Sequence, residues 1–370
     1  MKEKFVNPSK LQKFADLILL LIGVSFGILI AEGMLKIIEP SQLSTTHQPC
    51  IYLQDGQFGY RYKPNASGWI YRNFEMDNVV NINSMGFHDI EHEKNKGGNV
   101  PRILAVGDSF TASIHVETSK GWTQTLQREL RKMGYPSSDV VNLGLDGTGT
   151  DVHLSILKHY LPIFQPDVAI LAFFKNDFSD IKRNRGFREC YQGYVLVYKN
   201  DEQRDRLRDV VDKYKPGPFS IWLFNNLYLF RATTYLYTKG ILLRSNFLTP
   251  SLFDIPVNQK SVNPRELDSL LQQFVVLSQQ YNFKLFVIPV PPKEGATGSL
   301  DTLQRNISAT TLTQLDIIDI SRSVQNLLMK ENTSFDEMFW RFDGHFNTYG
   351  NHVFGRAVAE VIDEYYKLPR

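Results

Sequence analysis

The sequence has few cysteines, little net charge and no internal repeat. Only two cysteines occur in 370 residues, Cys50 and Cys190, and such isolated cysteines lack the spacing of a metal site. The formal net charge is only +2, which excludes the strongly basic surface typical of nucleic-acid-binding proteins. We therefore expect a globular chain with no nucleic-acid partner. The two thiols either form a disulfide, if they lie outside the cytoplasm, or are unrelated.

A long uncharged run near the N-terminus departs from this ordinary composition. Residues 17–31 carry no charge, and 11 of the 15 are Leu, Ile, Val or Phe. On an insertion scale these residues favour membrane insertion by about 3–7 kcal/mol. As a helix the run spans about 22 Å, less than the roughly 30 Å hydrocarbon core, so we expect it to extend further. The sequence predicts a transmembrane signal-anchor helix over 17–38, with a cleaved signal peptide and a buried core helix as the alternatives.

The lysines on the two sides of this run predict its orientation. Four lysines precede it within residues 1–16, and only Lys36 follows it closely. By the positive-inside rule, residues 1–16 are expected in the cytoplasm and the rest of the chain in the periplasm or outside the cell. No cysteine follows the run at the spacing of a lipoprotein signal, so a lipoprotein is not expected.

Strand and helix patterns alternate after residue 100. Such alternation predicts an α/β domain with a parallel sheet and helices on both faces. Residues 40–100, rich in Asn, Gly and aromatics, are expected to form a lead-in segment of short strands and turns before a domain over 101–370. The predicted strands are 102–107, 140–144, 167–174, 283–290 and 315–320, and the predicted helices are 121–134, 150–164, 265–282 and 348–366.

Residues 183–262 interrupt the alternation and are interpreted as an insertion. The early part is rich in charge and the later part is rich in aromatic residues, as in FSIWLFNNLYLF over 219–230. The aromatic part would form a lid, a surface on which sugars stack, or core beneath the insertion, and core is the commonest fate of such a stripe.

Polar side chains follow three of the predicted strands and precede the last helix. Ser109, Gly147 and Asn176 come after the first three strands, and Asp343 and His345 come just before the final helix. In an open parallel sheet, sites form at the carboxyl ends of strands. Each residue also has a plainer interpretation, since serine, asparagine and aspartate often cap helices and glycine often forms turns.

Together these residues supply the parts of an acyl-transfer site. A serine hydroxyl needs a neighbouring base, and His345 has the ordinary pKa of about 6.5 that suits this role. Asp343 would orient the imidazole, because residues i and i+2 of an extended backbone point to the same side. Backbone N–H groups at glycine turns and the Asn176 amide would hold the oxyanion.

The order of these motifs resembles that of the SGNH (GDSL-type) hydrolases. The resemblance rests on VGDSF at 106–110, NLGLDG at 142–147, KND at 175–177 and DGH at 343–345. It implies a flavodoxin-like three-layer α/β/α fold, with Ser109 as nucleophile, His345 as base and Asp343 as the residue that orients the base. It implies an oxyanion hole made by Ser109, Gly147 and Asn176, with Gly147 preferred to Gly144 because it lies five residues after Asn142. No cofactor and no metal are expected.

Two departures from the family pattern concern the pocket and the acid. Many members carry the acid three residues before the histidine, as D-x-x-H, but here that position is Phe342, so the acid must be Asp343. Members that act on envelope polysaccharides resemble the D-x-H form seen here. Phe174 stands where many members have glycine, which affects the shape of the pocket. The stretch NINSMGFH at 81–88 resembles a lead-in of membrane-anchored bacterial members.

Three functions fit this resemblance. The first is an extracytoplasmic serine esterase that hydrolyses O-acyl groups, O-acetyl above all, on an envelope glycan or lipid. The second is a polysaccharide O-acyltransferase, which would share the acyl-enzyme step and need a membrane-bound acyl-donor protein. The third is a non-catalytic glycan-binding envelope protein. The sequence does not distinguish water from a sugar as the acceptor.

The remaining histidines offer one competing site. On a helix, His88 and His92 would share a face and could ligate Zn²⁺, whereas the plainer interpretation is a solvated loop. The other histidines are expected at the surface or in caps; they are His47, His115, His153, His159 and His352.

Overall fold

The computed structural model divides the chain into two compact units. A helical unit contains residues 1–45 and 214–255, and an α/β unit contains residues 46–213 and 256–370. The structure describes residues 8–40, 43, 46–72, 75–97, 100–181, 187–214, 217–244, 263–295, 298–366 and 368.

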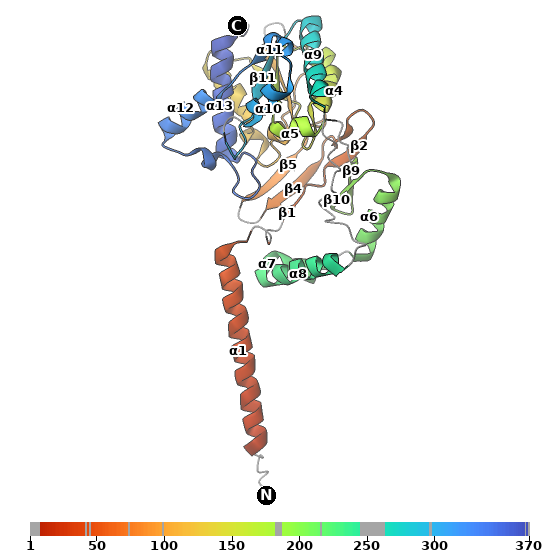
Figure 1. Cartoon of the computed structure of the whole chain (residues 1–370), viewed down its shortest axis with the longest axis vertical. Coiled ribbons are helices and arrows are strands. Elements are labelled where there is room, and N and C mark those ends of the chain that lie inside the picture. Colours follow the sequence, from red (N-terminus) through yellow and green to blue (C-terminus); the bar gives the residue numbers. More distant parts are fainter. Residues whose placement is uncertain are drawn as a thin grey trace. The chain divides into compact units, whose positions relative to one another are not determined.

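The helical unit is dominated by α1 (Pro8–Ile38), with α7 (Pro218–Asn226) and α8 (Tyr228–Arg244) beside it (Figure 1). Residues Gln12–Ile38 of α1 are long and apolar enough to cross a membrane, and none of that stretch is buried. The alternative of a buried core helix is therefore wrong. A membrane anchor and a signal sequence both remain consistent with this helix.

The α/β unit is built on a five-stranded parallel sheet. Its strands lie in the order β12-β11-β8-β6-β7, and every neighbouring pair is parallel. In chain order this is 2-1-3-4-5, the flavodoxin-like arrangement, so the predicted fold class is confirmed. The strands are β6 (Arg102–Gly107), β7 (Asp139–Asn142), β8 (Val168–Phe173), β11 (Lys284–Pro289) and β12 (Asp316–Ile317).

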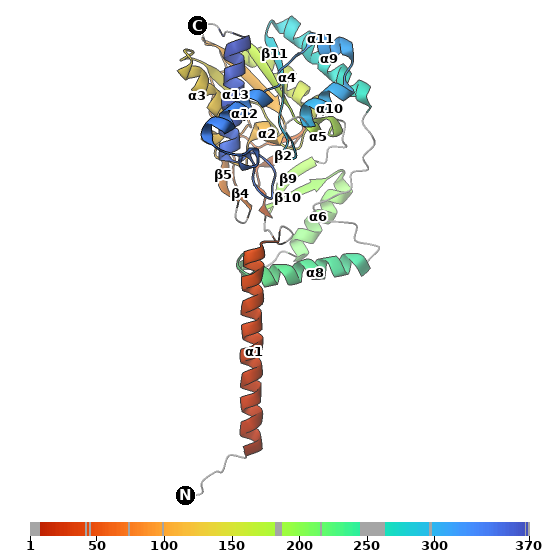
Figure 2. The ribbon, with the colours of Figure 1, turned by 60° about the vertical axis from the view of Figure 1, so that its left-hand side comes forward.

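Helices cover both faces of this sheet, as the alternating side chains of β6 show. Ile103 and Ala105 belong to a core with α3, α12 and α13, whereas Leu104 and Val106 belong to a core with α4, α9 and α10. The result is the predicted α/β/α layering (Figure 2). The bounds are α3 (Trp122–Lys132), α4 (Thr150–Phe164), α9 (Pro264–Tyr281), α10 (Gly298–Asn306), α12 (Ser321–Glu331) and α13 (Thr348–Tyr365).

The lead-in segment forms short antiparallel strands, as its composition predicts. One sheet contains β1, β4 and β5, and β2 pairs with β3. Side chains of this segment, including Tyr62 and Ile70, join the core on the α4 side of the main sheet. The bounds are β1 (Thr46–His47), β2 (Tyr52–Asp55), β3 (Gly59–Tyr62), β4 (Ser67–Arg72) and β5 (Met76–Asn81).

The stretch interpreted as an insertion is shared by the two units. The hairpin β9 (Phe187–Tyr191) and β10 (Tyr194–Tyr198), with α6 (Asp201–Tyr214), belongs mostly to the α/β unit, whereas 214–255 groups with α1. The expectation that the aromatic part is core is wrong for α7, which buries none of its side chains. Residues 182–186, 215–216 and 245–262 of this stretch lie outside the described residues.

Several short elements were not predicted, because they lack a long periodic pattern. They include α10, α11 (Ala309–Gln314), α12 and the 3-10 turns η2 (Thr118–Lys120) and η3 (Phe335–Met338). The last strand, β12, covers only part of the predicted 315–320.

A disulfide joins Cys50, just before β2, to Cys190 in β9, so the open question about the two thiols is answered by a bond. The two cysteines lie 140 residues apart in the sequence, with a Cα–Cα distance of 5.0 Å. The bond fastens the β9–β10 hairpin to the lead-in segment, next to strands β2 and β3.

We expect the Cys50→Ser/Cys190→Ser double variant to lose about 2–5 kcal/mol of unfolding free energy, because the bond closes a long loop in the unfolded chain. Urea unfolding of the two proteins measures this difference. Reduced wild type is the matched control and is expected to unfold with the double variant. Equal stability of oxidised wild type and the double variant would show that the bond constrains little.

Candidate active site

Ser109 lies at the first turn after β6. A Cβ at Gly107 would meet Thr111 Oγ1 at 2.2 Å and the Ala172 carbonyl at 2.8 Å, so only glycine fits where the strand ends. The helix α2 (Ser109–Ala112) then begins, and its N-cap is Asp108, whose Oδ1 accepts the Phe110 N–H at 2.9 Å. The plainer interpretation of Ser109 as an N-cap is therefore wrong, since Asp108 has that role.

A chain of two hydrogen bonds links Ser109, His345 and Asp343. The Ser109 Oγ lies 2.8 Å from His345 Nε2, and His345 Nδ1 lies 2.5 Å from Asp343 Oδ1. These three residues come from opposite ends of the domain in sequence, so the fold brings the predicted nucleophile, base and acid together. The order of the contacts is the one that activates a serine hydroxyl.

The loop that carries Asp343 and His345 is a tight turn and not the extended segment that the sequence analysis assumed. Gly344 between them has φ +83°, in the left-handed region that favours glycine. The pairing of the two side chains is as predicted, but the reason is this turn. A side chain at position 344 would strain it.

The lead-in segment holds this loop in place. The Glu75 carboxylate accepts the backbone N–H groups of Phe342 and Asp343. Arg72 Nη1 lies 3.8 Å from both Glu75 Oε2 and Asp343 Oδ2. Sequence analysis missed Glu75 and Arg72, because nothing in the sequence links residues 72–75 to residues 342–343.

We expect Glu75→Gln to lower kcat by about 10–100-fold, because an amide cannot accept both N–H groups and a small shift of the loop misplaces the base. Steady-state kinetics on a small ester measures kcat and KM separately, and KM is expected to change little. Asp77→Asn, which alters an exposed carboxylate bonded to the Trp69 indole, is the matched control. An unchanged kcat in Glu75→Gln would remove Glu75 from this role.

The pKa values of His345 and Asp343 are shifted in opposite directions. Burial alone would lower the pKa of His345, but the hydrogen bond and charge of Asp343 outweigh it and raise that pKa above its ordinary value. Burial alone would raise the pKa of Asp343, but His345, His115 and Arg72 together hold it far below the usual range. Asp343 is therefore ionised at neutral pH and stabilises a protonated His345.

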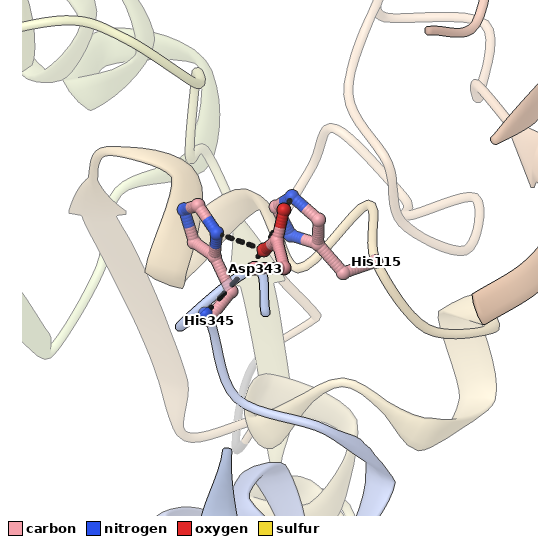
Figure 3. A group of neighbouring side chains, drawn as sticks. All are labelled: His115, Asp343 and His345. Atoms are coloured by element: carbon pink, nitrogen blue, oxygen red, sulfur yellow. Dashed lines mark hydrogen bonds and ion pairs between the residues drawn. The ribbon is translucent and has the colours of Figure 1, made fainter. Parts of the chain in front are cut away.

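His115 is a neighbour of this pair that sequence analysis placed at the surface or in a cap, which is wrong. It is buried, its ring stacks on His345 with centroids 4.0 Å apart, and its Nε2 lies 3.8 Å from Asp343 Oδ1 (Figure 3). Burial first, and then the positive charge that His345 can carry, lower the pKa of His115 to about 3. His115 is therefore uncharged at neutral pH, and its ring packs against that of His345. The expectation is also wrong for His153, which is fully buried.

In the part of the chain that the structure describes, only one group of side chains could ligate a metal ion. It consists of the three residues just described. Ligand atoms of His115, Asp343 and His345 lie within 4.8 Å of one another. Two of the three residues already bond each other, and His345 also bonds Ser109. The geometry is that of a base held by an acid.

His88 and His92 do not form the metal pair considered above. His88 contacts the Ala112 carbonyl and Thr118 Oγ1 through its two nitrogens, and it is buried. His92 lies between the carboxylates of Asp89 and Asp139, at 2.8 and 2.7 Å. These carboxylates outweigh burial and raise the pKa of His92 to about 9, so the ring acts as a structural cation.

The predicted oxyanion residues Gly147 and Asn176 follow β7 and β8, the two strands on either side of β6. Gly147 is exposed and has φ +67°, whereas Gly144 is buried where a Cβ would meet the Ala112 nitrogen at 2.2 Å. Asn176 is in the short helix α5 (Lys175–Ser179), and its Nδ2 donates to Asp180 Oδ2 at 3.2 Å. An amide nitrogen carries a second hydrogen for another acceptor.

A cluster of polar side chains next to Gly147 holds the loop that contains this glycine. Asp146 accepts hydrogen bonds from the hydroxyls of Tyr52 and Tyr62 and from Arg188 Nη1. Arg188 lies on the disulfide-bonded hairpin, and its Nη2 would be 2.6 Å from a Cβ at Gly147. The lead-in segment and the hairpin therefore set the position of this loop together.

Phe174 occupies the position where related sequences often have glycine. Its ring contacts Phe110 with centroids 4.3 Å apart, and Phe110 in turn contacts His345 at 4.9 Å. The departure noted in the sequence thus adds an aromatic contact behind the base. A cleft is lined by Glu75 and His115, which both contact the Asp343–His345 loop, and by Lys120 and Trp340 among others.

Known proteins that are similar to this chain include esterases. Esterase TesA of Pseudomonas aeruginosa is 33% identical over 75 residues, which are 20% of this chain and 37% of that protein, so the chain matches little more than a third of that relative. The match to the crystal structure of TesA covers 71% of this chain and 98% of the TesA chain, with 16% identity and a TM-score of 0.37. The match to the crystal structure of esterase EstA of a Pseudoalteromonas species covers 72% of this chain and 98% of the EstA chain, with 13% identity and a TM-score of 0.37. Residues 103–358 match the model of the GDSL-like lipase/acylhydrolases, and the chain belongs to this family of ester hydrolases.

Proposed function

We propose that the chain is a membrane-anchored, extracytoplasmic serine esterase that hydrolyses O-acyl esters, O-acetyl above all, on an envelope glycan or lipid. The observation that carries the proposal is the continuous contact from Ser109 through His345 to Asp343, at 2.8 and 2.5 Å. In an N-cap or loop role, these residues would have no reason to meet in this order.

In this proposal His345 Nε2 takes the proton of Ser109 Oγ as the oxygen attacks the ester carbonyl. The carbonyl oxygen becomes an oxyanion, which the backbone N–H groups of Ser109 and Gly147 and the Asn176 side chain would hold. Collapse of the tetrahedral intermediate breaks the bond to the leaving alcohol, which receives the proton from His345. Water, activated by the same imidazole, then releases the acid and restores Ser109.

The location outside the cytoplasm is supported by two observations. The lysines before residue 17 and the apolar helix Gln12–Ile38 fit an anchor with a cytoplasmic N-terminus. The Cys50–Cys190 disulfide fits an oxidising compartment, since such bonds are rare in the cytosol.

The test is an assay of the full-length chain, purified in detergent, on a small acetyl ester, with and without an acceptor oligosaccharide. The proposal predicts free acetate in both cases. Acetate recovered on the oligosaccharide would show acyl transfer in place of hydrolysis. No turnover of any ester by the folded chain would favour the glycan-binding alternative.

The same assay gives a pH dependence. His345 must be neutral to accept the serine proton, and Asp343 raises the pKa of His345. Activity is therefore lost as the pH falls through this raised pKa, and we expect the acidic limb of kcat/KM to have its midpoint above about 6.5. A midpoint well below that value would show that the base in the free enzyme is not a histidine stabilised by Asp343.

A further inference from the structure

The helices α7 and α8 expose an unusual amount of apolar surface. On α7, Phe219 is 70% exposed and Trp222 is 54% exposed, and on α8 Leu236 is 67% exposed. Ile221, Phe224 and Tyr235 are exposed beside them. Exposed apolar side chains gathered on two helices that contact each other are typical of a surface that meets a membrane or a partner, and aromatic residues are typical of the interface between lipid and water.

Over residues 217–236 this surface carries no exposed charge, because the one charged residue there is buried, and the other charged residues of α8 are Lys239 and Arg244 in its last turns. Arg231 is the only charged residue in 217–236, and it is 3% exposed. Its guanidinium donates to the carbonyls of Phe224 and Asn225, at the C-terminal end of α7, and to that of Leu43. The apolar surface is therefore not interrupted by a solvated cation.

Two partly buried hydrogen bonds join the start of α8 to Glu32 of α1. The Glu32 carboxylate accepts the backbone N–H groups of Tyr228 and Leu229, the first residues of α8, at 3.0 and 2.8 Å. Glu32 is also the first charged residue after the uncharged run 17–31. The start of α8 is thus held just after the uncharged run, about 9 Å before the end of α1.

The direction of α8 follows from the same contact. Both views show α8 running crosswise to α1 near the C-terminal end of α1 (Figures 1 and 2). If α1 crosses a bilayer, α8 lies along the plane of that bilayer at its outer boundary. Interfacial helices bury their apolar side chains about 5–10 Å into this boundary.

We propose that α7 and α8 form a second membrane contact, which lies in the outer lipid–water interface beside the anchor. The occupant of the surface is the phospholipid bilayer. The proposal rests on the membrane anchor of the proposed function, but not on the esterase activity. It assigns the aromatic part of 183–262 to lipid, in place of the lid, sugar-stacking surface or core that the sequence suggested.

Quenching of Trp222 by brominated lipid tests this proposal. The full-length chain is reconstituted into phosphatidylcholine nanodiscs with bromine on the acyl carbons near the headgroup, and its tryptophan emission is compared with that in unbrominated nanodiscs. Trp222→Phe is measured in parallel, so that the difference isolates Trp222 from the other three tryptophans. We expect the bromine-dependent loss of emission to be large in the wild type and to fall clearly in Trp222→Phe.

A second variant reports on the anchor itself. Phe26→Trp places an indole in the middle of the apolar run and is expected to be quenched by bromine deep in the acyl chains. Quenching at position 26 with no quenching of Trp222 would overturn the proposal without affecting the membrane anchor. The exposed surface of α7 and α8 would then be a contact with a protein partner. No quenching at either position would overturn both the anchor and this proposal.

Discussion

Replacement of Ser109 by alanine is expected to lower ester turnover by about 10⁵–10⁶-fold, the size of the loss when a serine hydrolase loses its nucleophile. The fold is expected to tolerate the change, because the cap of α2 is made by Asp108. The thermal midpoint should therefore move little. Turnover and thermal unfolding of the same purified chain measure the two effects.

Ser113→Ala is the matched control for this prediction. Ser113 caps the C-terminal end of the same short helix, and its hydroxyl oxygen lies 2.9 Å from two acceptors that share its one hydrogen, the Phe110 carbonyl and Asn351 Oδ1. Its loss removes a buried hydrogen bond from the Phe110 carbonyl, whereas Asn351 Oδ1 still accepts the Trp122 N–H, and it is expected to cost about 1–3 kcal/mol of stability while turnover persists. The reverse pattern, with Ser109→Ala active, would exclude Ser109 as nucleophile.

Replacement of Asp343 by asparagine is expected to lower kcat by about 10⁴-fold, as the equivalent change does in serine proteases. The amide presents the wrong partner to His345 Nδ1 and removes the charge that stabilises a protonated ring. The pKa of His345 should then fall, so the acidic limb of the pH profile should move to lower pH. A pH series of kcat/KM for both proteins tests this.

The matched control is Asp336→Asn, which changes an exposed carboxylate in η3, shortly before the same loop. It is expected to leave both the rate and the pH profile unchanged. Wild-type turnover in Asp343→Asn would show that Asp343 does not act on the base. A lower rate with an unmoved pH limb would point to a positional effect alone.

The sheet could be predicted from the sequence because its strands are continuous apolar runs. Strand β6 matches the predicted 102–107, and α4 matches the predicted 150–164. The residues that form the Ser109–His345–Asp343 contact were predicted as well, from their places at a strand end and before the last helix and from the resemblance of the motif order to that of a known family.

What supports those residues could not be predicted in the same way. Glu75 and His115 reach the Asp343–His345 loop through contacts between distant segments, which leave no local pattern in the sequence. The caps were also ambiguous, because Asp108 and Ser109 are adjacent and both residue types favour that position. The grouping of α7 and α8 with α1 depends on contacts between distant residues, such as those of Glu32 with the start of α8.

Covalent modification by a fluorophosphonate identifies the nucleophilic serine of this chain directly. Such reagents react with activated serines, and the modified residue is identified by mass spectrometry of peptides from the labelled full-length chain. The account predicts a single adduct, on Ser109, that is absent from folded Ser109→Ala and still present in Ser113→Ala. An adduct on another serine, or labelling that persists in folded Ser109→Ala, would contradict it.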